Sequence, residues 1–213
     1  MKDNIKIFKN GLATGLILQL AIGPVFFFII NLTLQKTIFD GLIAVLAVTI
    51  VDYFYITLAI LGIGKFLIKE KVKKIFVIVS SVVLIVFGFI IIKGITGEGI
   101  LTAINTNSAN LFTSFTSALF LTISSPMTII FFTSLFTAKA VEYNYTKKGL
   151  LIFGWATGLA TLVFMSASVI LFSLIKANIP IILIQILNFA VGCLLIGYGA
   201  IRLIGVLKQK KSS

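Results

Sequence analysis

Asp52 is the one acidic residue inside the long apolar runs of this chain, near the middle of residues 41–64. A charged side chain at the centre of a bilayer costs roughly 2.5–3.5 kcal/mol on insertion scales, so it is rarely placed there without a use. Thr49 and Tyr55 lie three residues to either side, on the same face of a helix, and could hydrogen-bond Asp52 or a ligand. The alternative is a protonated structural carboxyl that joins neighbouring helices. We predict that Asp52 binds a ligand and exchanges a proton.

Two prolines interrupt other apolar runs. Gly23-Pro24 lies within residues 11–34, and Ser124-Ser125-Pro126 lies within residues 111–137. Proline lacks the N–H of a helix interior, and its ring clashes with the preceding turn. A helix that restarts after such a break has unpaired N–H groups and a positive dipole end, which could hold a carboxylate. If Asp52 binds an ammonium group and the helix breaks bind a carboxylate, together they would match the two charges of an amino acid. A simple proline kink is the alternative at each position.

Small and polar residues lead up to the first break at every fourth position, namely Gly11, Gly15, Gln19 and Gly23. We expect Gly11 and Gly15 to allow close helix packing, within the chain or in a homodimer. Residues nearer the breaks could join helices or contact a ligand. The candidate substrate-binding residues are Gln19, Gly23, Pro24, Thr49, Asp52, Tyr55, Ser124, Ser125 and Pro126.

The composition indicates an integral membrane protein, because 59% of the 213 residues are hydrophobic and only 11% are charged. Inside a membrane the backbone N–H and C=O groups of such a run must hydrogen-bond within the protein, so each run is predicted to be a helix. The runs are continuously apolar rather than alternating, which argues against a β-barrel. We therefore predict one all-α transmembrane domain over residues 1–213 with six crossings. The six runs are approximately 11–34, 41–64, 75–92, 111–137, 149–175 and 180–201.

The basic residues predict the orientation. Fifteen of the 18 lysines and arginines fall at the termini and in the second and fourth loops, and three (Lys36, Lys93 and Lys176) fall on the other side. By the positive-inside rule both termini are cytoplasmic, in a protein of the cell membrane. The net charge of +12 therefore indicates contact with lipid headgroups rather than with nucleic acid.

The two halves of the chain resemble each other. Residues of about 1–93 can be aligned with residues of about 111–213, across a polar linker of about 94–110. Pro24 aligns with Pro126 at a shift of 102, Thr49 with Thr157 at 108, and Gly88 with Gly197 at 109. Because three crossings are an odd number, the second repeat would enter from the opposite face. This is the inverted-repeat plan of many secondary transporters.

Several other classes of function lack support in the sequence. There is no histidine and a single cysteine, Cys193, so tight metal binding is not expected, and no cofactor motif is present. No nucleophile–base pair indicates an enzyme. A cation exporter and a membrane scaffold remain as alternatives to an exporter of amino acids or similar zwitterions.

The chain resembles the lysine exporter (LysE) family of amino-acid efflux proteins, including its homoserine/threonine branch. The resemblance rests on Ala21-Ile22-Gly23-Pro24, Gly41-Leu42, Val51-Asp52 and Gly62-Ile63-Gly64, and on Ser125-Pro126 followed by Ile129-Ile130-Phe131-Phe132. It implies efflux driven by protons or by the membrane potential.

The chain departs from the family pattern beside the expected site. Val25-Phe26 follow Gly-Pro where the lysine/arginine exporters usually have Gln-Asn, Ser125 replaces an Asn, and Val51 replaces a Ser or Gly. The substrate therefore cannot be copied from any member of the family.

Overall fold

A computed structural model of the chain describes residues 2–20, 23–62, 70–95, 111–124, 126–176 and 180–210, and these residues form helices joined by short connections. The predicted linker falls largely outside them, at residues 96–110. The helices are α1 (Lys2–Gln19), α2 (Pro24–Gln35), α3 (Ile38–Ile60), α5 (Glu70–Ile95), α7 (Leu111–Ile123), α8 (Pro126–Tyr143), α9 (Lys147–Ile175) and α10 (Ile181–Lys210). The prediction of an all-α protein is confirmed.

Three of these helices, α3, α9 and α10, are long and apolar enough to cross a membrane. Two bent pairs each supply one more candidate crossing: α1 and α2 meet at 77°, and α7 and α8 meet at 61°. The expected breaks in the first and fourth runs are therefore present, and they are sharper than simple kinks. The apolar part of α5 is the shorter stretch Val77–Lys93, so a sixth crossing stays a prediction.

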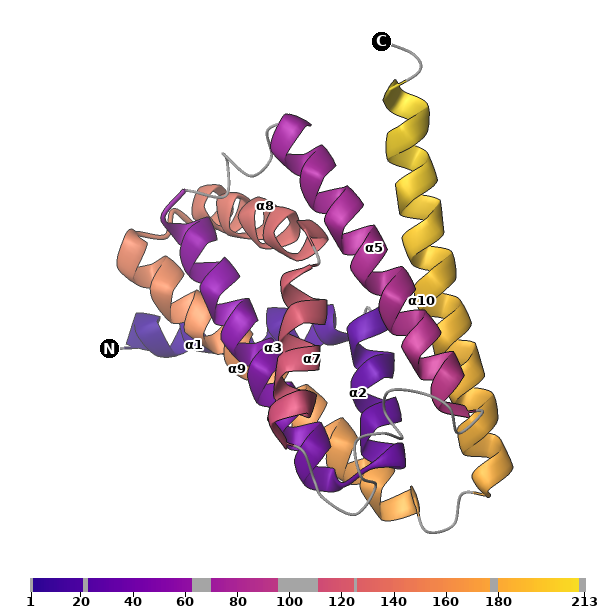
Figure 1. Ribbon diagram of the computed structural model, residues 1–213. Helices are drawn as coiled ribbons and strands as arrows, with labels where there is room; N and C mark the ends of the chain where they lie inside the picture. The colour runs from indigo at the N-terminus through magenta and orange to yellow at the C-terminus, as the bar shows by residue number, and fades with distance from the viewer. Residues whose placement is uncertain are drawn as a thin grey trace.

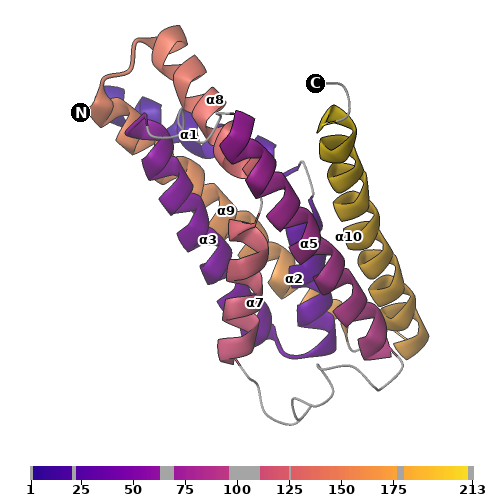
Figure 2. The same ribbon diagram turned by 45° about the horizontal axis from the view of Figure 1, so that its top comes forward.

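The bent pairs pack against the opposite half of the chain. Helix α1 lies along α9, while α7 and α8 lie along α3 (Figure 1). Helices α3 and α9 also contact each other, and α5 and α10 form a separate pair beside them (Figures 1 and 2). Residues around both breaks are thereby held against the two central helices, α3 and α9.

Close approach of α1 and α9 depends on two glycines. A Cβ atom on Gly11 would lie 2.8 Å from Cβ of Ala156, and one on Gly15 would lie 2.9 Å from the Thr157 carbonyl oxygen. Both distances are too short for real side-chain contacts. Gly11 and Gly15 therefore serve packing within the chain, one of the two uses expected for them.

A second buried carboxylate, Asp40, lies at the start of α3, one residue before the apolar run 41–64 that the sequence predicts. Thr37 caps α3 in a capping box with Asp40. Ser114 of α7 donates a 2.6 Å hydrogen bond to Asp40 Oδ1. Asp40 is fully buried and joins the starts of α3 and α7, so its role is structural.

Candidate functional site

The first break places an uncapped helix start in the middle of the molecule. Gly23 is the N-cap of α2 in an extended conformation, and within the described residues no side chain caps it. Pro24 follows at the first helical position, where its missing N–H costs little. The N–H of Phe26 donates a hydrogen bond to the Gly23 carbonyl at 3.1 Å. The N–H of Val25, also in the first turn of α2, has no partner among the described contacts.

The second break is held in place by α3. Helix α7 ends at Ile123, whose carbonyl oxygen accepts a 2.8 Å hydrogen bond from the buried Tyr55 hydroxyl. The last carbonyls of a helix have no partner within it, so Tyr55 satisfies one that the break exposes. Helix α8 then restarts at Pro126.

A cavity of about 380 Å³ lies between the two breaks and the central helices. This volume is within the usual range for small-molecule sites. Its polar lining comprises Gln19, Asp52, Thr122, Thr128, Thr157 and Thr161. Its other lining residues are Gly15, Leu18, Gly23, Pro24, Val25, Phe26, Val48, Phe131, Phe132 and Met165.

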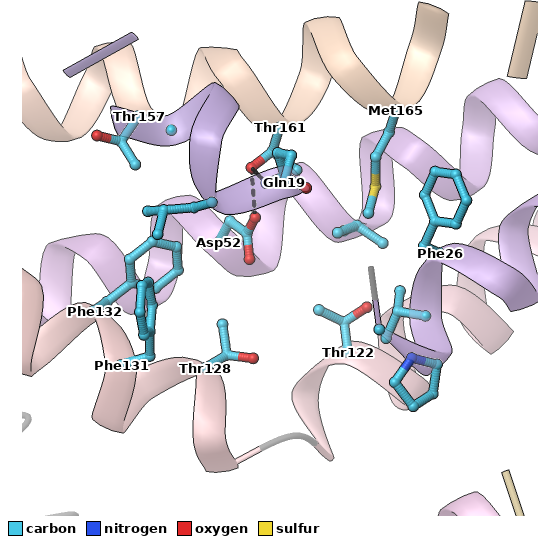
Figure 3. A pocket seen from close by; sticks show the side chains of 16 residues that line it. Gln19, Phe26, Asp52, Thr122, Thr128, Phe131, Phe132, Thr157, Thr161 and Met165 are labelled. Carbon is cyan, nitrogen blue, oxygen red and sulfur yellow. Dashed lines mark hydrogen bonds between the residues drawn. The ribbon is translucent and has the colours of Figure 1, made fainter. Parts of the chain in front are cut away.

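A chain of hydrogen bonds orients Asp52 at this cavity. Thr161 of α9 donates its hydroxyl to Asp52 Oδ2 at 2.9 Å, and the side-chain amide of Gln19 donates to Thr161 Oγ1 at 2.7 Å. The other carboxylate oxygen of Asp52 points into the cavity (Figure 3). The carboxylate is thus fixed on one side by Thr161, which Gln19 supports in turn, and is available to a ligand on the other.

The ends of the cavity are apolar. Phe131 and Phe132 of α8 lie at one end, and Phe26 and Met165 lie at the other (Figure 3). Phe26 is itself supported by the ring of Phe164, with centroids 6.0 Å apart. A ligand bound at Asp52 would therefore extend along aromatic and thioether surfaces.

Four of the nine candidate residues from the sequence line this cavity: Gln19, Gly23, Pro24 and Asp52. Thr49 and Tyr55 lie outside the lining, since the Thr49 hydroxyl donates to the Val45 carbonyl and the Tyr55 hydroxyl to Ile123. Ser124 is half-buried in the turn and does not line it. Ser125 and the side chain of Pro126 lie outside the described part of the chain.

Sequence reasoning missed Thr161 and the aromatic residues of α8. Thr161 lies one helical turn after Thr157, and this spacing on a glycine-bearing helix was an available signal. Among the described residues, no group of three His, Cys, Asp or Glu side chains could hold a metal ion.

Comparison with protein families gives one finding. A model of the LysE type translocator family matches residues 16–205, which covers both breaks and every residue that lines the cavity except Gly15. Neither the curated proteins nor the solved structures contain a match to this chain.

Proposed function

The chain belongs to the LysE type translocator family and is a membrane transporter, and from this premise we propose that it exports amino acids or similar small zwitterions in exchange for protons. The observation that carries the proposal is the oriented carboxylate of Asp52 in a cavity between two helix breaks. An isolated carboxylate in this position would be costly unless a cation or a proton neutralised it.

Asp52 is the proposed exchange site. Its carboxylate holds the ammonium group of the substrate, and a proton replaces that ammonium when the substrate leaves. One positive charge thus replaces another, so that the carboxylate is never left uncompensated inside the membrane. Gln19 and Thr161 keep the carboxylate oriented throughout the exchange.

The substrate carboxylate is placed at the start of α2. The amide of Val25 and the positive end of the helix dipole provide the favourable electrostatic environment there. The start of α8 is the proposed counterpart in the second repeat. Of the remaining candidates, Tyr55 acts by fixing the end of α7 rather than by touching substrate.

Two inverted three-helix repeats, with six crossings in all, are the proposed architecture. The reciprocal packing of α1 along α9 and of α7 along α3 supports it, because a two-fold relation between the halves would exchange these two contacts. The start of α1 and the end of α10 also lie at the same end of the molecule (Figure 2). The lysine distribution supports a cytoplasmic location for that end, in a protein of the cell membrane.

Transport by purified protein in proteoliposomes tests the proposal. Vesicles that enclose a pH-sensitive dye are given single amino acids under an imposed pH gradient. We expect a proton flux that depends on the amino acid and saturates with its concentration. If no amino acid moves protons or is itself transported by correctly inserted protein, the proposed function is wrong, and a scaffold or a cation exporter becomes the better explanation.

A further inference from the structure

We propose that the substrate is a neutral amino acid with an apolar side chain, not a basic or hydroxylated one. This inference rests on the proposed function and concerns the same cavity.

The cavity provides a partner for only one cationic group. Asp52 is the one charged side chain among the described lining residues. Two other described acids are committed elsewhere: Asp40 accepts hydrogen bonds from Thr37 and Ser114, and Glu142 pairs with Lys139 at 2.8 Å. A basic amino acid would bring a second ammonium or a guanidinium into this cavity without a carboxylate to meet it. An unpaired charge there is strongly unfavourable.

Three of the four threonine hydroxyls in the lining already donate to groups of the protein. Thr122 donates to the Ala118 carbonyl at 2.7 Å, Thr157 donates to the Phe153 carbonyl at 2.9 Å, and Thr161 donates to Asp52. Selection for a substrate hydroxyl requires polar groups that the hydroxyl alone can satisfy. These three threonines are satisfied without it, so they give a hydroxylated side chain no such advantage.

Apolar groups flank the carboxylate on both sides. The rings of Phe131 and Phe132 lie at one end of the cavity and Phe26 with Met165 at the other, with Asp52 between them (Figure 3). An ammonium bound at Asp52 therefore directs the side chain of the substrate onto apolar surface. Aromatic and thioether groups adapt to aliphatic and aromatic side chains alike.

Two pairs of substrates of nearly equal shape test this assignment in proteoliposomes. Norleucine differs from lysine only by the terminal ammonium, and valine differs from threonine by a methyl group in place of the hydroxyl. We expect kcat/KM for norleucine to exceed that for lysine by about tenfold or more. We expect kcat/KM for valine to exceed that for threonine by a similar factor of about tenfold or more. Pentylamine, which is norleucine without its carboxylate, is expected to be a poorer substrate than norleucine.

The outcomes separate this inference from the proposed function. Preference for lysine or threonine would overturn the substrate class and leave an amino-acid exporter in place. Preference for pentylamine would overturn both the class and the carboxylate site. Absence of transport with every amino acid would overturn the proposed function itself.

A pair of phenylalanine variants locates the apolar contact. Phe131→Ala removes a ring that lines the cavity, whereas Phe120→Ala removes an exposed ring of α7 outside the lining. We expect the first variant to raise KM for norleucine and to lower the norleucine-to-lysine preference by about tenfold, while the second leaves both unchanged. Equal effects of the two variants would contradict the proposed contact.

Discussion

Thr161 donates a 2.9 Å hydrogen bond to Asp52 across the interface between α9 and α3. The two residues are 109 positions apart, one more than the shift of 108 that aligns nearby Thr49 with Thr157 in the two halves of the sequence. The carboxylate and the residue that orients it therefore come from matching regions of the proposed repeats. A site formed in this way exists only when both halves are folded against each other.

Thr161→Val should weaken substrate binding while leaving the protein folded. A hydrogen bond to a charged group contributes about 1.5–3 kcal/mol, which corresponds to roughly a tenfold or greater rise in KM. Thr133→Val is the matched control, because Thr133 is buried, its side chain bonds only to the Ile129 carbonyl among the described contacts, and it does not line the cavity. Substrate efflux measured over a concentration series gives KM for both variants. An unchanged KM in Thr161→Val would show that this hydrogen bond does not support binding.

Tyr55→Phe should disturb the second break. The substitution leaves the Ile123 carbonyl at the end of α7 without its hydroxyl donor, at a cost of about 1–3 kcal/mol. We expect a lower Tm in detergent and slower efflux. Tyr53→Phe removes a comparable bond, from the more exposed Tyr53 hydroxyl to the Trp155 carbonyl, and should have a smaller effect. Equal losses in the two variants would argue against a special role for the end of α7.

Ser114→Ala should lower stability without a specific effect on substrate affinity. Asp40 Oδ1 would lose its donor from α7 while remaining buried, at a cost of about 1–3 kcal/mol. Ser134→Ala serves as the control, because Ser134 is exposed and bonds only within α8 among the described contacts. Thermal unfolding in detergent and KM for efflux distinguish the two roles. A raised KM at unchanged Tm would place Asp40 in the transport pathway instead.

The positions of both helix breaks and of Asp52 could be predicted because each depends on one residue in an apolar run. Proline breaks a helix wherever it falls in the interior, and a carboxylate is conspicuous among apolar side chains. The family assignment followed from the same residues and is confirmed. These features require no knowledge of how the helices pack.

The partners of Asp52 could not be predicted, because they depend on which helix faces it. Thr49 was expected to support Asp52 from the same helix, yet a threonine within a helix readily bonds the carbonyl four residues back, as Thr49 does with Val45. Thr161 supports Asp52 instead, because glycines such as Gly158 bring α9 close to α3. Tyr55 does not support Asp52 either, because its hydroxyl donates to the Ile123 carbonyl at the end of α7.

The Asp52→Asn variant tests the central claim most directly. Asparagine keeps the shape of the side chain and can still accept a hydrogen bond from Thr161, but it can neither hold a proton nor pair ionically with an ammonium. In proteoliposomes containing equal amounts of inserted protein, we predict that proton flux driven by an amino-acid substrate falls to background in this variant. Export of that substrate by Asp52→Asn at the wild-type rate, with the wild-type dependence on the pH gradient, would contradict the assignment of Asp52 as the exchange site.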